Sequence, residues 1–166
     1  VVIDPSDNDR GLLDERGIKF MHLGLTAQNY EAVLTPLLRS TANNQSFCVN
    51  LSVDTCSLDI MKLSRDLGAF YIDTVVEPWT GFYFDEKKGI AERLNYALRE
   101  TILEEKAKSP GGVTAVSCCG ANPGMVSWFV KKALIQLAED TKTPYTKPKT
   151  REDWAKLMQK VGVKGI

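Results

Sequence analysis

Two patterns of hydrophobic and polar positions alternate along the chain. Short apolar runs rich in Val, Ile and Phe predict strands, and the longer amphipathic segments between them predict helices. The strands are predicted at 1–4, 18–23, 46–51, 69–74 and 113–118, and the helices at 9–15, 27–39, 58–67, 88–107, 124–140 and 151–160. This alternation favours an α/β fold with an open parallel sheet and helices on both faces.

Polar residues and a proline mark where three of these helices are expected to begin. Thr26 and Ser57 are predicted to cap the helices that follow them, because their hydroxyl oxygens can accept from the first free backbone N–H groups. Pro123 is predicted in the first turn of the helix at 124–140, where a missing N–H has no cost.

The ends of the chain and one internal segment suggest how it is organised. The run 1–3 reads as a buried strand with no turn before it, and 161–166 resembles the opening of another strand. We therefore expect an internal piece, truncated at both ends. The segment 142–149 is polar and contains two prolines, which predicts a linker.

Composition excludes several classes of function. Lys+Arg and Asp+Glu are balanced at 21 each, so no long-range field favours a nucleic acid or a membrane as partner. The four cysteines lack the paired spacing of zinc sites and the density of a disulfide framework, which favours a reducing cytoplasm and no metal. No uncharged apolar run reaches the roughly 18 residues that a membrane helix needs.

Candidate binding residues follow the predicted strands, because open parallel sheets bind ligands beyond the carboxyl ends of their strands. Asp4 ends the first strand, where an acid can accept hydrogen bonds from the adenosine ribose and disfavour a 2′-phosphate, so NAD is preferred over NADP. A simple turn at 4–7 explains Asp4 equally well. After the third strand, the polar cluster at 50–57 is expected both to face a cofactor and to cap the next helix.

Two further clusters carry candidate chemistry. Glu77 next to Trp79 offers a carboxylate and an indole face to an ammonium group, although a surface ion pair and a core tryptophan are the commoner explanations of such a pattern. Asn122, in a run of small residues at 117–125, can orient a ligand through its amide or cap the next helix. His22, the one histidine, is expected to have a packing or surface role.

Together, four segments resemble bacterial homospermidine synthase, and the wider similarity is to saccharopine dehydrogenase-like reductases. These segments are 50–54, 71–79, 95–100 and 117–128. The resemblance implies a two-domain homodimer with a Rossmann-type domain and NAD as a recycled cofactor. Its activity would be aminobutyl transfer that joins two putrescines, or related diamines, and releases ammonia. NAD would carry the hydride while the protein orients the amine.

The same resemblance assigns roles to individual residues. It implies that Glu77 and Asn122 are catalytic and substrate-binding groups of a diamine pocket, which reverses the expectation that Glu77 lies in a surface ion pair, and that Trp79 forms part of the wall. Similarity and position at strand ends together give the cofactor-side candidates, which are Asp4, Asn50, Leu51, Ser52 and Thr74.

The chain departs from the family by lacking parts. No glycine-rich turn precedes residue 1, and further pocket residues of the family lie beyond residue 166. We therefore predict that 1–145 is an NAD-binding domain without its first strand and glycine-rich turn, and that 146–166 is a linker and the start of a second domain. Such a polypeptide is expected to be inactive alone.

Two other functions remain open from the sequence. An NAD(P)-dependent saccharopine dehydrogenase-like reductase acting on an amino acid or carboxylated polyamine would need an Arg or Lys in its pocket, whereas a diamine pocket needs carboxylates and aromatic faces. A binding module that has lost catalysis is the third reading.

Overall fold

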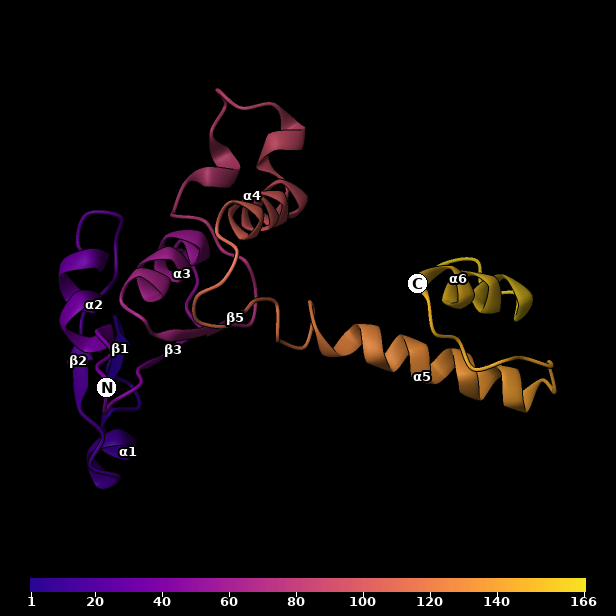
Figure 1. Cartoon of the computed structure of the whole chain (residues 1–166), viewed down its shortest axis with the longest axis horizontal. Coiled ribbons are helices and arrows are strands. Elements are labelled where there is room, and N and C mark those ends of the chain that lie inside the picture. The colour runs from indigo at the N-terminus through magenta and orange to yellow at the C-terminus, as the bar shows by residue number, and fades with distance from the viewer. The chain divides into compact units, whose positions relative to one another are not determined.

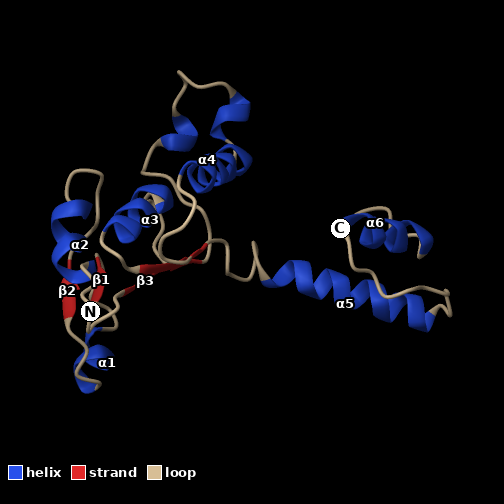
Figure 2. Ribbon diagram, viewed as in Figure 1, coloured by secondary structure: helices blue, strands red, loops and turns tan.

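The computed structural model describes residues 1–166 and divides into two compact units, unit 1 at 1–117 and unit 2 at 118–166. Each predicted strand and helix is present, most of them shorter than predicted, and the helix expected at 88–107 is split in two (Figures 1 and 2). In chain order, the elements of unit 1 are β1 (Val2–Asp4), α1 (Arg10–Glu15), β2 (Phe20–His22), α2 (Tyr30–Leu38), β3 (Phe47–Asn50), α3 (Ser57–Asp66), β4 (Phe70–Asp73), the 3-10 helices η1 (Phe82–Phe84) and η2 (Ile90–Arg93), α4 (Asn95–Lys108) and β5 (Ala115–Val116). Unit 2 contains α5 (Met125–Asp140) and α6 (Arg151–Lys160).

The strands form two parallel sheets, with β1 beside β2 in one and the order β3-β4-β5 in the other. A Rossmann sheet has the strand order 3-2-1-4-5-6. In that order, β1 and β2 take the places of strands 2 and 3, and β3, β4 and β5 take the places of strands 4, 5 and 6. The central strand 1 is not among these five strands. Phe47 and Val49, which alternation places on the same face of β3, are 57% and 56% exposed, so this face of the strand is open. The predicted Rossmann-type α/β fold of parallel strands flanked by helices is confirmed.

A single apolar core holds the two sheets of unit 1 together. Its buried residues come from α2, α3 and β4, and partly buried Ile3 of β1 and Cys48 of β3 pack against it. The buried members are Leu34, Leu38, Ile60, Ala69 and Tyr71. Full burial of an aliphatic side chain contributes about 1.5–3 kcal/mol, so this core positions the strand ends described below.

The three predicted helix starts were wrong. Helix α2 begins after Asn29, whose side-chain oxygen accepts from the backbone N–H of Thr26 (2.7 Å). Helix α3 begins after Cys56, so Ser57 is its first helical residue instead of its cap. Pro123 lies in the turn before α5, not in its first turn. The observed starts differ from the predicted ones by one to three residues, and turns precede α2 and α5 whereas extended Cys56 precedes α3.

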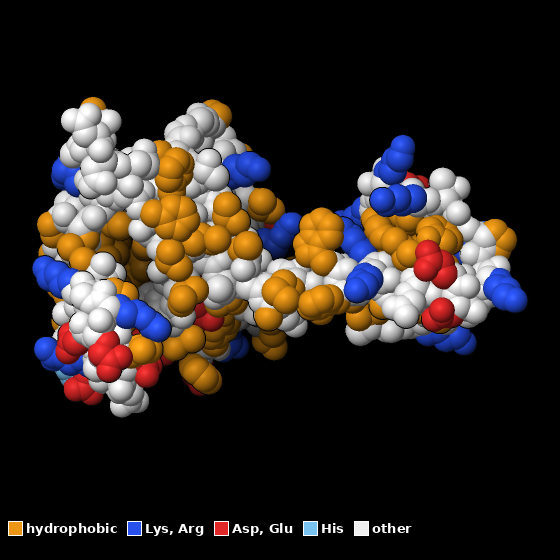
Figure 3. All heavy atoms as spheres, turned by 90° about the horizontal axis from the view of Figure 1, so that it is seen from below, with side chains coloured by type: hydrophobic (Ala, Val, Ile, Leu, Met, Phe, Trp, Pro, Cys, Tyr) orange, Lys and Arg blue, Asp and Glu red, His pale blue; other side chains and the backbone are white.

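In unit 2, α5 and α6 pack side by side through Leu134, Ala138 and Leu157. Helix α6 begins as predicted, with reciprocal hydrogen bonds between Thr150 and Asp153 at its start. Both units also carry apolar side chains on their surfaces (Figure 3). None of the helices is both long enough and apolar enough to span a lipid bilayer.

Candidate functional site

A chain of buried hydrogen bonds joins the carboxyl ends of β3, β4 and β5. The Asn50 amide donates to the Tyr71 hydroxyl (3.2 Å), which donates to Asp73 Oδ2 (2.9 Å), and the Ser117 hydroxyl donates to Asp73 Oδ1 (2.8 Å). Burial and then the negative charge of Asp73 raise the pKa of Tyr71, so its hydroxyl remains a donor at neutral pH. This network fixes three neighbouring strand ends at the edge where parallel sheets bind ligands.

The loop after β3 extends the network. Asn50 Oδ1 accepts from the backbone N–H of Ser52 (3.2 Å) and from its hydroxyl, which also contacts the hydroxyl of Thr55. The Asn50 side chain is therefore engaged within the protein, while Leu51 is 68% exposed. Thr74 lies at the same edge, because it follows Asp73, the register partner of Asn50. The structure thus brings four of the five cofactor candidates to one sheet edge, and their cofactor contacts remain a prediction.

Asp4, the fifth candidate, ends β1 in the other sheet and is exposed. Its Oδ1 accepts from the backbone N–H of Ser6 (2.7 Å), so the turn at 4–7 is present. His22, opposite Asp4 in the register, donates from Nε2 to the carbonyl of Pro5 (2.8 Å) and holds this turn. The expected surface role of the histidine is confirmed. The other oxygen of Asp4 remains an acceptor suited to a ribose hydroxyl.

A cavity of about 540 Å³ lies beside the segment that follows β4. Glu77 and Trp79 line it together, and a second carboxylate comes from Asp85; the substrate-binding roles of Glu77 and Trp79 remain a prediction. The remaining lining residues are Cys56, Leu58, Val76, Pro78, Thr80, Gly81, Phe82, Leu98 and Thr101. Lys88 Nζ lies 4.4 Å from the centroid of the Phe82 ring, so an aromatic ring of the lining already accommodates an ammonium group.

The electrostatics of this cavity favour a cation. Burial and then the negative charge of Asp54 raise the pKa of Glu77, which forms no salt bridge in the structure. Burial and then the charge of Glu77 raise the pKa of Tyr83, whose hydroxyl donates to Asn95 Oδ1 (2.8 Å). No Lys or Arg lines the cavity. A half-buried carboxylate without a cationic partner is stabilised by a ligand that brings positive charge.

Asn122 lies in unit 2, exposed in a tight turn before α5. The Gly120 N–H donates to the Pro123 carbonyl (3.1 Å), and the Met125 N–H donates to the Gly120 carbonyl (2.8 Å). Gly124 has φ 130°, and a Cβ there would overlap the backbone of Gly120, so the turn requires glycine. Gly124, not Asn122, precedes the first helical residue, so the capping role considered for Asn122 is wrong. Its amide is accessible, and its catalytic role remains a prediction.

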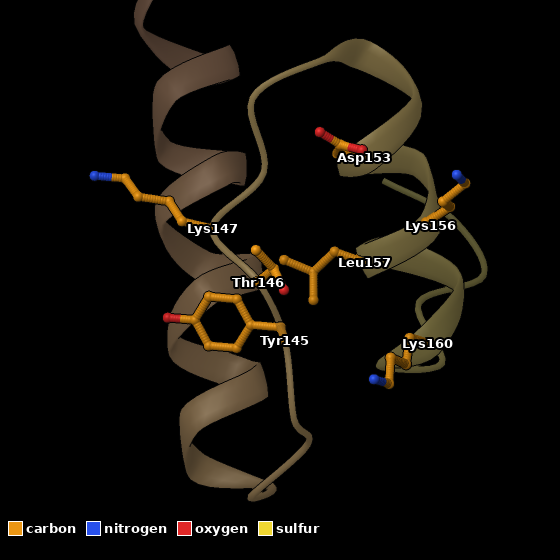
Figure 4. Close-up of a pocket in the computed structure, with 7 residues that line it drawn as sticks. All are labelled: Tyr145, Thr146, Lys147, Asp153, Lys156, Leu157 and Lys160. Atoms are coloured by element: carbon orange, nitrogen blue, oxygen red, sulfur yellow. The ribbon is translucent and has the colours of Figure 1, made fainter.

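A second hollow, of about 220 Å³, lies between α6 and the segment before it in unit 2 (Figure 4). It is lined by Lys147, Lys156 and Lys160, of which the first two point in different directions, and Lys160 donates to a backbone carbonyl. Asp153 accepts from the backbone N–H groups of Lys149 and Thr150 and so serves the helix start. The polar groups here are used by the fold, and the hollow lacks converging functional groups.

Sequence reasoning missed part of both sites. Asp85 and Phe82 line the cavity but were not predicted, although the aromatic-acidic run at 82–85 is a signal that could have identified them. The buried pairing of Tyr71 with Asp73 was also missed, although alternation along β4 places both on the same buried face. No three His, Cys, Asp or Glu side chains lie close enough to hold a metal ion, and no disulfide joins the four cysteines.

Comparison with known proteins places these features in a family. Residues 1–116 match the saccharopine dehydrogenase NADP binding domain. The chain is 61% identical over 167 residues to a homospermidine synthase of Mesorhizobium japonicum, covering 99% of this chain and 34% of that protein. It is 60% identical over 166 residues to a homospermidine synthase of Blastochloris viridis, covering 100% and 35%.

A solved structure agrees with the sequence comparisons. The crystal structure of homospermidine synthase from Legionella pneumophila in complex with NAD matches with a TM-score of 0.69 and 32% identity, over 95% of this chain and 31% of that one. The resemblance to homospermidine synthase is therefore confirmed along the whole chain, which spans about a third of the length of the curated relatives it matches. Since the match at 1–116 covers most of its residues, the chain belongs to the saccharopine dehydrogenase NADP-binding domain family.

Proposed function

We propose that this chain is the cofactor-binding part of a longer enzyme, an NAD-dependent homospermidine synthase, here called the full-length synthase. Its reaction would be aminobutyl transfer that joins two putrescines and releases ammonia. The proposal draws on the relatives at 61% and 60% identity. Within this chain, the single observation that carries it is the cavity with two carboxylates, aromatic walls and no basic lining residue.

The residues of the cavity suit a diamine. Glu77 is half-buried with a raised pKa, and an ammonium group beside it would stabilise the deprotonated form. Trp79 offers a ring face to positive charge, and Phe82, over whose ring Lys88 Nζ already lies, offers apolar surface to the alkyl chain. Asp85 gives the second carboxylate that a ligand with two ammonium groups needs. Asn122 would orient the substrate through its exposed amide, by similarity to the family.

The strand ends fit the adenosine side of NAD. The Asp4 carboxylate is exposed at the end of β1 and suits ribose hydroxyls, whereas a 2′-phosphate there would meet a like charge. Leu51 and Val53 are 68% and 73% exposed in the loop after β3 and offer apolar surface to a ring. When bound, NAD would accept a hydride from the amine substrate and return it later. The description of the domain family names NADP, whereas the crystal structure of the Legionella enzyme contains NAD.

The remaining expectations belong to the same proposal. We place the cofactor domain at 1–145 and the start of a second domain at 146–166, with the full-length synthase a homodimer in the cytoplasm. The number and spacing of the four cysteines fit a reducing compartment. Because the relatives are about three times as long, turnover is expected from the full-length synthase and not from these residues alone.

The test is formation of homospermidine from putrescine and NAD by the full-length synthase, followed by mass spectrometry. Glu77→Gln should lower kcat/KM by at least about tenfold, because it removes one hydrogen bond to a charged group. Glu100→Gln, on the exposed surface of α4, is the matched control and should retain activity.

Absence of product from a folded, NAD-loaded enzyme would overturn the synthase proposal. In that case, NADP-dependent oxidation of an amino acid or a carboxylated polyamine would favour the reductase, in line with the family description. If calorimetry detects binding of neither NAD nor NADP, the interpretation as a binding module without catalysis would be favoured.

A further inference from the structure

The first turn of α3 holds the segment that carries Glu77. Ser57 is fully buried at 0% exposure. Its backbone N–H donates to the Glu77 carbonyl (2.8 Å), and its hydroxyl accepts from the Glu77 N–H (2.9 Å) and donates to the Val75 carbonyl (3.2 Å). Both backbone polar groups of Glu77 are therefore held by one residue.

Two residues further along the same turn, Asp59 holds Trp79. The indole Nε1–H donates to Asp59 Oδ2 (2.7 Å), and the ring of Tyr30 packs on the indole with centroids 5.4 Å apart. Burial, a hydrogen bond to Glu31 and the charge of Asp59 raise the pKa of Tyr30 to about 12, so this contact remains between neutral rings. The indole is thus fixed at its edge and on one side.

The Ser57 hydroxyl does not cap the helix. Cys56 precedes α3 without a side-chain cap, and the Ser57 hydroxyl binds the backbone of the segment 75–77 through two hydrogen bonds. A buried hydroxyl with two partners restricts a backbone more than a solvated loop would. The first turn of α3 therefore sets where the Glu77 carboxylate and the Trp79 ring stand in the cavity.

We propose that Ser57 and Asp59 are positioning residues of the amine pocket, Ser57 for the Glu77 backbone and Asp59 for the Trp79 indole. The identity of the ligand rests on the proposed function, while the positioning rests on the contacts themselves. A displacement of about 1 Å in a reactive geometry can cost about a hundredfold in rate, so loss of either contact is expected to act on substrate use more than on folding.

The chain offers a matched control for Ser57. Ser64 is on the same helix and is equally buried at 0% exposure. Its hydroxyl donates to the Ile60 carbonyl (2.8 Å) and also contacts the Cys48 thiol, away from the residues that line the cavity. In the full-length synthase, Ser57→Ala should raise the KM for putrescine about tenfold while NAD affinity is unchanged. Ser64→Ala should leave both values within about twofold, and thermal unfolding of the two variants should be compared. Equal putrescine KM values in the two variants would overturn the role of Ser57.

Asp59 is tested by a conservative pair. Asp59→Leu removes the acceptor, whereas Asp59→Asn keeps a carbonyl oxygen for the indole N–H. Asp59→Leu should raise the putrescine KM about tenfold, and Asp59→Asn should recover most of the loss. If Asp59→Asn is as impaired as Asp59→Leu, charge and not positioning is the cause, and the proposal fails for Asp59.

A readout without substrate separates this proposal from the proposed function. In protein labelled with 5-fluorotryptophan, the fluorine resonance of Trp79 can be assigned with Trp79→Phe. It should shift and broaden in Asp59→Leu and remain in place in Ser64→Ala. If the enzyme makes no homospermidine but this resonance moves as expected, only the proposed function fails. If the resonance does not move in Asp59→Leu, the positioning proposal fails whatever the activity.

Discussion

Tyr71→Phe tests whether the buried hydrogen bonds at the strand ends hold the candidate cofactor edge together. The substitution keeps the ring, and therefore the packing, but removes a hydroxyl that donates to Asp73 and accepts from Asn50. These three residues are 2%, 1% and 7% exposed, so water cannot readily replace the lost partner. A hydrogen bond to a charged group contributes about 1.5–3 kcal/mol, and an unsatisfied amide adds about 1 kcal/mol.

We therefore expect Tyr71→Phe to lower the free energy of unfolding by about 3 kcal/mol. The measurement is urea unfolding of the full-length synthase followed by fluorescence. Tyr145→Phe is the control, because that hydroxyl donates to Glu139 at the exposed surface and should be worth less than about 1 kcal/mol. A loss for Tyr71→Phe no larger than that of the control would refute the idea that the network stabilises the strand ends.

Four further predictions follow from the cavity and from Asp4. Asp85→Asn should raise the putrescine KM about tenfold without changing kcat, since it removes one carboxylate from the binding site, while Glu86→Gln at the neighbouring exposed position should have no effect in the same assay. Because burial and the charge of Asp54 raise the pKa of Glu77 above its ordinary 4.5, putrescine affinity measured by calorimetry should rise with pH through that raised pKa, and Glu77→Gln should abolish this pH dependence. The same shift means that the folded state favours protonated Glu77, so a stability cost develops as pH rises above 4.5 and is complete above the folded pKa; Glu77→Gln should be the more stable protein at neutral pH, and a less stable variant there would contradict the shift. Asp4→Asn should improve the ratio of NADP to NAD affinity about tenfold, because one repelling charge is lost, and an unchanged ratio would separate Asp4 from the ribose.

The sequence by itself determined the order of elements and the fold class. Strand and helix periodicities depend on local side-chain pattern, so the strands and the helices at 58–67 and 151–160 were predicted within a few residues. The placement of polar residues after strands also follows from local order, so the sequence predicted which polar residues end the strands and that Glu77 lies near Trp79. Long motifs carried the resemblance to the family.

Only the tertiary structure decided which of these residues share a site. Asp85 reaches the cavity through the η1 segment, and Ser117 donates to Asp73 across 44 positions of sequence. Alternation along β4 puts Tyr71 and Asp73 on one face but leaves the Ser117 partner unspecified. The use of Ser57 and Asp59 depended in the same way on α3 packing against the segment after β4. Local pattern specifies which face of an element is buried, whereas the partner of each polar group depends on packing between elements distant in sequence.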